Sequence, residues 1–380
     1  MLFSRQGLLA PSVISLLLAG NAVAGDARTR ARDALKTLQG WYNSTSGIWD
    51  TCGWWDGASC MNTVADLAAL DPSVIDTATY VFNNTFHVGP VSNPSPGPEH
   101  KTVYTRDNQP STSVNASQWL DQAYDDDGWW ALAWIAAYDV TKQATYLELA
   151  EGIFESLANA WGTHCGGGGL PWSPNSTYVN AITNEVFLSV AAHLANRVPD
   201  RKEFYVRWAQ KEWDWFAAQD FIGANGTVND GLLDNCKNNG ATVWSYNQGV
   251  VLGGLVELNR AAPNDTYLPA ANKIAKAAIT ALADSNNVIH EFCEPECLPD
   301  GTQFKGIFIR NLRMLQKASP HDIYQKVISS CATSIWNNDR NEKGQFGVNW
   351  AGPIQAVVDA STHSSALDAL VAAVAALGAK

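Results

Sequence analysis

The most informative stretch of this chain for its architecture is YDDDGWWALAWIAAY, which runs from Tyr124 to Tyr138. Three consecutive carboxylates stand before two tryptophans, and an apolar run follows them. Like charges this close repel each other, so burying them requires a compensating reason. The apolar run predicts a buried helix, and the polar residues before it predict the loop that leads into that helix.

The same order of segments recurs along the chain. A loop rich in Gly, Trp and Asn precedes an apolar helix, and a more charged amphipathic helix follows. The loops that lead into the apolar helices fall near residues 54–62, 125–130, 178–185, 244–249, 304–306 and 350–363. The amphipathic helices are expected at residues 27–42, 146–161, 201–216, 268–282 and 323–336, with 72–82 as the weakest of the set. A period of about 55 to 60 residues marks a repeat architecture. We therefore predict an all-α fold, an (α/α)₆ barrel of six helical hairpins with an inner apolar ring and an outer ring.

Both ends of the chain contain apolar runs of the kind found in targeting signals. Residues 1–24 read as a secretory signal peptide, with Arg5 as the only charge before Asp26 and a small-residue site at Ala22-Val23-Ala24. The apolar run at 366–377 lacks the polar spacer of a lipid-anchor signal and suits a buried helix. We expect residues 25–380 to form one catalytic domain that is secreted, monomeric and without a transmembrane segment.

Composition limits the partners. The chain has 37 acidic and 25 basic side chains, a net charge of −12, which argues against nucleic acid and is compatible with a neutral polysaccharide. Seven cysteines fit an oxidising compartment, with at least one unpaired, and Cys293 and Cys297 favour disulfide bonding over a metal site. Six glycosylation sequons support a secretory route: Asn43, Asn83, Asn115, Asn175, Asn225 and Asn264.

Asp125 and Asp126 are the strongest candidates for chemistry. A glycosidase needs one protonated carboxyl group as general acid and one ionised group as nucleophile or base. Two neighbouring acids push their pKa values apart, so one can hold a proton near neutrality. Adjacent residues at a helix start can place their carboxyl groups about 5 Å apart, the spacing of retaining enzymes. The structural alternative is that Asp residues cap a helix, which needs only one of the three.

The motifs at this point resemble glycoside hydrolase family 76, the α-1,6-mannanases and their fungal cell-wall relatives. The resemblance rests on YDDDGWW at 124–130, GWWDGA at 53–58, YNQG at 246–249 and FKGIF at 304–308, in that order along the chain. It implies an (α/α)₆ barrel and a retaining enzyme, with Asp125 as nucleophile and Asp126 as acid/base. Asp127 stands where relatives often carry another polar residue, and we expect it to be a cap or a support.

The loops before the predicted inner helices supply the expected sugar-binding residues. The resemblance and the loop positions together point to Trp54, Asp56, Tyr124, Trp129, Asn180, Asn184, Trp244, Tyr246, Asn247, Phe304, Lys305, Gly306 and Trp350. About half of the tryptophans are expected to be core residues, since tryptophan is mostly buried on average. For Asn247 a helix cap is an equal alternative, and His363 is expected to be a structural histidine.

From these residues and the family resemblance we expect the protein to be a secreted, retaining endo-α-1,6-mannanase. Its expected location is extracellular or associated with the cell wall. The alternatives are a transglycosylase of mannan or glycolipid-anchor glycans, and a mannan-binding protein without turnover. The chain carries no His-Glu-x-x-His motif and no Gly-x-Ser-x-Gly elbow. We expect no catalytic metal and no cofactor.

Overall fold

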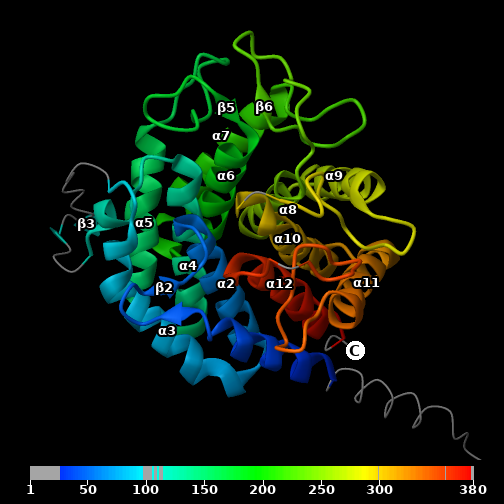
Figure 1. Cartoon of the computed structure of the whole chain (residues 1–380). Helices are drawn as coiled ribbons and strands as arrows, with labels where there is room; N and C mark the ends of the chain where they lie inside the picture. Colours follow the sequence, from blue (N-terminus) through cyan, green and yellow to red (C-terminus); the bar gives the residue numbers. More distant parts are fainter. Residues whose placement is uncertain are drawn as a thin grey trace, which may run out of the picture.

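A computed structural model describes residues 26–96, 105–106, 109–110, 114–297, 299–355 and 357–377. Six helices form an inner ring: α2 (Trp54–Leu70), α4 (Tyr124–Thr141), α6 (Ala181–Ala195), α8 (Ser245–Ala261), α10 (Phe304–Ala318) and α12 (Ala360–Leu377). Each contacts the next, and α12 packs against α2, so the ring is closed. Figure 1 follows this circle from blue α2 through green α6 and yellow α8 to red α12.

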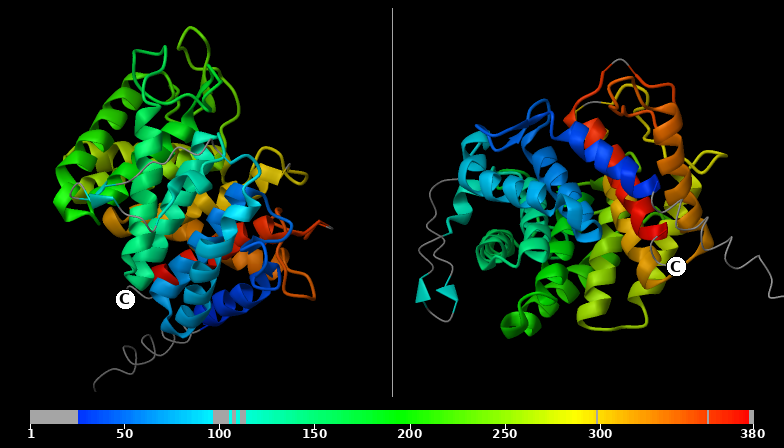
Figure 2. Two further views of the ribbon diagram at one scale, coloured as in Figure 1. Left: turned by 90° about the vertical axis from the view of Figure 1, so that its left-hand side faces the viewer. Right: turned by 90° about the horizontal axis from the view of Figure 1, so that it is seen from below.

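A second set of helices lies outside this ring. It consists of a helix at residues 26–38, α3 (Ile75–Val88), α5 (Ala144–Asn159), α7 (Lys202–Ala218), α9 (Tyr267–Leu282) and α11 (Asp322–Asn338). The helix at 26–38 lies beside α12 (Figure 2), where His363 Nε2 contacts the Ala34 carbonyl oxygen at 2.8 Å. The predicted (α/α)₆ barrel is confirmed. The first outer helix ends earlier than expected, and the residues that follow it form a short strand pair.

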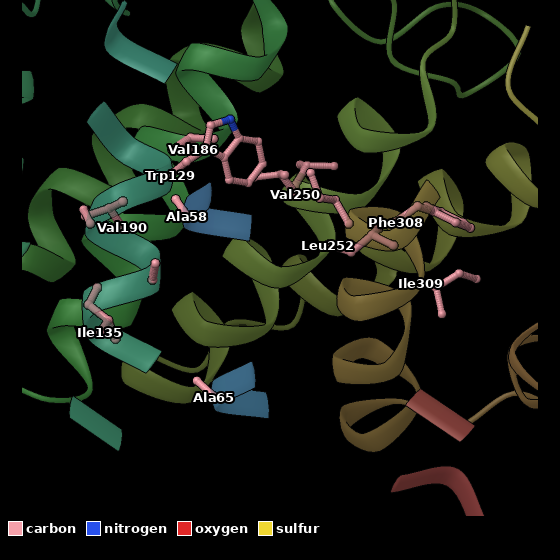
Figure 3. Close-up of a cluster of buried hydrophobic side chains, with 14 of the residues drawn as sticks. Ala58, Ala65, Trp129, Ile135, Val186, Val190, Val250, Leu252, Phe308 and Ile309 are labelled. Carbon is pink, nitrogen blue, oxygen red and sulfur yellow. The ribbon is translucent and has the colours of Figure 1, made fainter. Parts of the chain in front are cut away.

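Burial separates the two rings. Fourteen of the fifteen residues of α6 are buried, against seven of the seventeen residues of α7. An apolar surface on all sides requires neighbours on all sides, so such a helix belongs in the inner ring. Figure 3 shows the core between the inner helices, where Trp129 on α4 extends toward Val250 on α8.

Glycines allow the inner helices to approach each other where they begin. A Cβ atom on Gly128 of α4 would lie 2.2 Å from Val186 Cγ1 on α6, and one on Gly306 of α10 would lie 2.6 Å from Ser365 Cα on α12. Both distances are far below van der Waals contact. The glycine in each motif is therefore required for packing between neighbouring inner helices.

Each strand in the described part of the chain is two residues long. The pairs are β1 (Tyr42–Asn43) with β2 (Ile48–Trp49), β3 (Thr105–Arg106) with β4 (Gln109–Pro110), and β5 (Val179–Asn180) with β6 (Gly231–Leu232). The 3₁₀ turns are η1 (Pro72–Val74), η2 (Gly89–Ser92), η3 (Ala116–Trp119), η4 (Pro199–Arg201) and η5 (Pro299–Thr302).

Disulfides hold the loops before α6, α8 and α10. Cys165 pairs with Cys236, and Cys293 pairs with Cys297 as the sequence favoured, while Cys52, Cys60 and Cys331 are free thiols. The expected signal peptide at residues 1–24 lies outside the described residues. Among the helices that are described, none is both long and apolar enough to cross a bilayer.

Candidate active site

The N-terminal ends of the inner helices meet at one end of the ring, which we call the N-terminal rim. Three contacts join its parts. Trp55 Nε1 on α2 donates to Asp300 Oδ1 before α10 at 3.0 Å. The Tyr246 ring on α8 stacks on the Phe304 ring on α10 with centroids 3.7 Å apart. Burial is the main cause of the raised pKa of Tyr246. The negative charges of Asp125, Asp300 and two further acids raise this pKa further, and they come from other loops and helices. The rim therefore brings together residues that are far apart in the sequence.

Four carboxyl groups form an acidic cluster at the start of α4: Asp121, Asp125, Asp126 and Asp127. Burial, reinforced by the charges of Asp121 and Asp300, raises the pKa of Asp125 to about 7. Burial also raises the pKa of Asp126 well above its ordinary value, and repulsion from Asp125 and Asp121 adds to this effect. Asp125 Oδ1 is buried with no hydrogen-bond partner among the described residues. An unpaired buried carboxylate oxygen is costly, and together with a raised pKa it makes Asp125 a candidate functional residue.

Asp127 has a structural place in this cluster. Its side chain is 1% exposed, and its Oδ1 accepts the backbone N–H of Asp121 at 2.9 Å. Asp121 Oδ1 in turn accepts the N–H of Ala123, the N-cap residue of α4, at 3.0 Å. Asp127 thus supports the turn before α4 rather than capping the helix itself.

Aromatic rings line the rim beside the acids. Trp55 lies next to Trp129 with centroids 5.8 Å apart, and next to Phe304 at 6.2 Å. Trp244 meets Phe304 edge to face at 5.4 Å. Trp129 follows Asp125 by one helical turn, so both lie on the same side of α4. The expected residues Trp129, Trp244, Tyr246 and Phe304 are therefore gathered near Asp125.

Buried polar atoms without partners come from several inner helices at the rim. Among the described residues they include Asp56 Oδ1, Asn180 Oδ1, both carboxylate oxygens of Glu185, both amide atoms of Asn247, and both amide atoms of Gln303. Buried polar groups are nearly always hydrogen-bonded in folded proteins. A concentration of unpaired donors and acceptors is what a site for a hydroxyl-rich ligand or for bound water requires. Asp56 also has a local role, because its Oδ2 accepts the Gly53 N–H at the start of α2.

Two expected sugar platforms lie inside the protein. Trp54 packs against Trp130 and Trp119, with centroids 4.6 and 5.7 Å away. Trp350 is 0% exposed and lies in the loop ten residues before α12, where the Lys305 ammonium group sits 4.5 Å from its ring centroid. Neither ring has a free face for a sugar, so both are core residues. In the GWWDGA segment Trp54 and Trp55 point to different sides of α2, and it is Trp55 that faces the rim.

Several expected hydrogen-bonding residues are occupied by the protein itself. Lys305 is 0% exposed, and its ammonium group pairs with Glu294 and donates to the Val348 carbonyl oxygen at 2.5 Å. The side-chain amide of Asn184 accepts a hydrogen bond from the Leu170 N–H and donates one to the Leu170 carbonyl oxygen. Gly306 donates its N–H to Ser365 Oγ at 2.9 Å. These placements correct the expectation that Lys305, Asn184 and Gly306 contact substrate.

His363 has the structural role that the sequence predicted, and Tyr124 lies at the edge of the candidate site. His363 is buried between the Ala34 carbonyl and the Phe346 N–H, and burial lowers its pKa to about 4, as fits a structural histidine. Tyr124 directly precedes Asp125, and its N–H donates to the Trp172 carbonyl oxygen at 3.0 Å.

The sequence reasoning missed Trp55, Asp121, Asp300, Glu185 and Trp172. Trp55 and Asp121 lie within or just before quoted motifs, so a closer reading of helical phase could have found them. Trp172 is 45% exposed, and two backbone hydrogen bonds, to Tyr124 and Tyr178, hold it beside the start of α4. Asp300 and Glu185 are single acids in separate segments, and only the fold brings them to the rim.

Two other features in the described part of the chain lack the free polar groups of a site. His164, Cys165 and Cys236 lie close together, but the two sulfurs are joined in a disulfide and are not free metal ligands. A cavity of about 200 Å³ lies inside the ring, and Trp129 forms part of its wall. Its charged groups are paired with each other, as Arg313 is with Asp66 at 2.8 Å and Arg197 with Glu257 at 2.9 Å. We therefore place the candidate site at the rim.

The fold and the site define a helical-barrel protein with carboxyl groups and aromatic rings gathered where its inner helices begin. The sequence model of glycosyl hydrolase family 76 matches residues 23–379. The chain belongs to this family.

Relatives and solved structures agree with this membership. The chain is 29% identical over 300 residues to a putative mannan endo-1,6-alpha-mannosidase of Schizosaccharomyces pombe, covering 74% of this chain and 63% of that protein. It is 26% identical over 281 residues to the mannan endo-1,6-alpha-mannosidase DFG5 of Candida albicans, covering 68% and 62%. The matches therefore span less than two thirds of these relatives' length.

Among solved structures, an inactive variant of the α-1,6-mannanase GH76A of Salegentibacter sp. HEL1_6 superimposes with a TM-score of 0.75 at 20% identity, over 92% of this chain and 99% of that one. Dfg5 of Chaetomium thermophilum superimposes with a TM-score of 0.71 at 21% identity, over 93% and 90%. At this identity the structural likeness establishes the fold.

Proposed function

We propose that this protein hydrolyses α-1,6-mannosidic bonds within a mannan backbone, with retention of anomeric configuration. The observation that carries this proposal is the pair of adjacent carboxyl groups at the start of α4, both with raised pKa values and one with an unpartnered oxygen. Retaining glycosidases require such a pair.

In the first step, the Asp125 carboxylate attacks the anomeric carbon while Asp126 donates its proton to the leaving glycosidic oxygen. The bond to the leaving sugar breaks, and a glycosyl ester on Asp125 forms. In the second step, a water molecule attacks the same carbon and gives a proton to Asp126. The ester bond to Asp125 breaks, and both carboxyl groups return to their starting states.

Electrostatics supports this division of roles. Catalysis requires one proton on the pair, held by the acid. Asp126 is repelled by Asp125, Asp121 and Asp127, whereas Asp125 is repelled chiefly by Asp121 and Asp300. The larger number of like charges that act on Asp126 favours it as the member that keeps its proton while Asp125 ionises.

The substrate class comes from the relatives. The curated relatives are mannan endo-1,6-alpha-mannosidases, and the solved Salegentibacter variant, inactive after two adjacent aspartates were changed to asparagine, binds α-1,6-mannotriose. The Trp55, Trp129, Tyr246 and Phe304 rings pack against one another, and we propose that this largely buried aromatic cluster forms the apolar floor of the sugar site. We also propose secretion, with the cell wall as the place of action.

A transglycosylase remains the second candidate, because the glycosyl ester formed in a retaining mechanism can be attacked by a hydroxyl group other than that of water. A sugar hydroxyl would then replace water in the second step. Incubation with mannan, with and without an added oligosaccharide acceptor, separates the two, since transfer to the acceptor exceeds hydrolysis only for a transglycosylase.

The test of the proposed chemistry is the pair of variants Asp125→Asn and Asp126→Asn. Each is expected to lower kcat on linear α-1,6-mannan by at least about a thousandfold, since each removes one half of the reaction. Circular dichroism should show the wild-type fold, and tryptophan fluorescence should show retained binding of mannotriose. The exposed Asp33→Asn variant on the first outer helix is the matched control and should keep full activity. Near-normal turnover by both active-site variants would refute the assignment, and binding without turnover by the wild type would indicate a mannan-binding protein.

A further inference from the structure

The first turns of α6 carry a buried acid to which the proposed reaction assigns no role. Glu185 is 0% exposed, and neither of its carboxylate oxygens has a hydrogen-bond partner among the described residues. Burial without a partner disfavours the charged form and raises the pKa of Glu185 well above its ordinary value. The neutral carboxyl group that results can offer a ligand one O–H donor and one acceptor oxygen.

Two neighbours of Glu185 on α6 show where the adjacent inner helices lie. Val186 faces α4, because a Cβ atom on Gly128 would lie 2.2 Å from Val186 Cγ1. Leu188 faces α8, because a Cβ atom on Gly254 would lie 3.0 Å from Leu188 Cγ. The two flanks of α6 are therefore occupied by other residues than Glu185.

The third neighbour marks the outward side of α6. The Phe187 ring stacks on Phe154 of the outer helix α5 with centroids 5.3 Å apart. Successive residues of an α-helix are turned by about 100°, so four consecutive residues point to four different sides. Since the other three sides are assigned, Glu185 points into the interior of the inner ring.

The proposed nucleophile points into the same interior. Three residues from neighbouring inner helices line the cavity inside the ring: Trp129 on α4, Ser189 on α6 and Val250 on α8. Asp125, Glu185 and Tyr246 each lie one helical turn before one of these three, so their side chains point toward one shared space. In agreement with this arrangement, the charge of Glu185 contributes to the raised pKa of Tyr246.

We propose that Glu185 is a specificity-determining residue that binds a hydroxyl group of the mannose unit attacked by Asp125. This inference rests on the proposed function and names a substrate contact within the same site. The carboxyl group donates one hydrogen bond to the sugar and accepts another. Because Glu185 is fully buried on the inward side of α6, a hydroxyl group bound there has no room for a side-branch sugar. The site therefore selects mannan whose attacked unit is unbranched at that hydroxyl group.

Binding of α-1,6-mannotriose tests this contact without turnover, in protein that carries Asp125→Asn. Adding Glu185→Leu removes the donor and the acceptor, and Kd from calorimetry should rise at least about tenfold. Adding Glu185→Gln instead keeps a donor and an acceptor, and Kd should stay within about threefold of the parent value. Equal Kd values for the parent and both variants would overturn the proposal.

Glu212 on the outer helix α7 is the matched control. It is also 0% exposed, and both of its carboxylate oxygens lack partners among the described residues. Replacing an unpartnered buried acid with Leu should leave the midpoint of urea unfolding unchanged or raise it at either position. Only Glu185→Leu should weaken mannotriose binding. An equal loss of binding in Glu212→Leu would overturn the proposal, because burial alone would then explain the effect.

Mannotriose analogues that each lack one kind of ring hydroxyl group in all three units test the contact with Glu185 in place. One analogue should bind at least about tenfold more weakly than mannotriose, and this difference should vanish in Glu185→Leu. Equal Kd values for every analogue with Glu185 present would overturn the proposal even if the wild type cleaves mannan. A wild type that neither cleaves mannan nor binds mannotriose would refute the proposed function instead.

Discussion

Asp125 and Asp300 show how a single exposed charge acts on the chemistry of a buried neighbour. Asp300 lies on the loop before α10, tied to Trp55, and its charge contributes to the raised pKa of Asp125. The proposed nucleophile must be ionised, so kcat/KM should fall as the pH drops through about 7, where Asp125 takes up its proton.

The variant Asp300→Asn should move this acid limb to lower pH. Removing a neighbouring negative charge makes ionisation of Asp125 easier, so its pKa falls and activity persists in more acidic solution. The asparagine oxygen can still accept the Trp55 N–H, which keeps the contact. The pH profile of kcat/KM checks this, with Asp220→Asn, an exposed acid paired with Lys237, as the control. An acid limb that stays at the wild-type pH would show that Asp300 has no effect on the nucleophile.

Lys305 is expected to act on stability and not on substrate binding. It is buried against Glu294, and breaking a buried pair leaves the other charge uncompensated. Lys305→Met should therefore lower the free energy of unfolding by about 3 kcal/mol, and the double variant Lys305→Met/Glu294→Gln should recover much of the loss. Urea unfolding measures both. Unchanged stability with a raised KM would restore Lys305 to the substrate-binding set.

We propose that the loops before the inner helices carry the sugar contacts, and that these contacts extend beyond the acidic cluster. Trp172 is exposed, and its carbonyl oxygen accepts the N–H of Tyr124, the residue before Asp125. A mannan chain that passes the cluster on this side would meet its ring.

Trp172→Ala should raise KM for long mannan chains by about fivefold, since an aromatic contact contributes on the order of 1 kcal/mol. Turnover of the shortest cleavable oligosaccharide should change little, because such a substrate does not reach the ring. Tyr80→Ala, another exposed aromatic residue but on α3, is the control. Equal losses on long and short substrates would place Trp172 outside the substrate path.

Over the whole molecule, the sequence was most predictive where hydrophobic periodicity alone sets the structure. Apolar surface on every side of the inner helices predicted the closed double ring, and the motif glycines fall where helices touch. The side-chain contacts at the rim were less predictable. Whether Trp54 or its neighbour faces the rim depends on a rotation of about 100° along one helix. Lys305 was misassigned because its partner Glu294 comes from the disulfide loop, whose path the sequence does not reveal.

The proposed function depends on one reaction, the cleavage of α-1,6-mannan by the Asp125–Asp126 pair with retention. The most direct measurement is NMR of linear α-1,6-mannan during digestion, which follows product length and the anomeric configuration of the new reducing ends together. We predict a fall in chain length throughout the polymer, with new ends that appear first as the α-anomer and later equilibrate. New ends that appear first as the β-anomer, or mannan that stays intact, would contradict it.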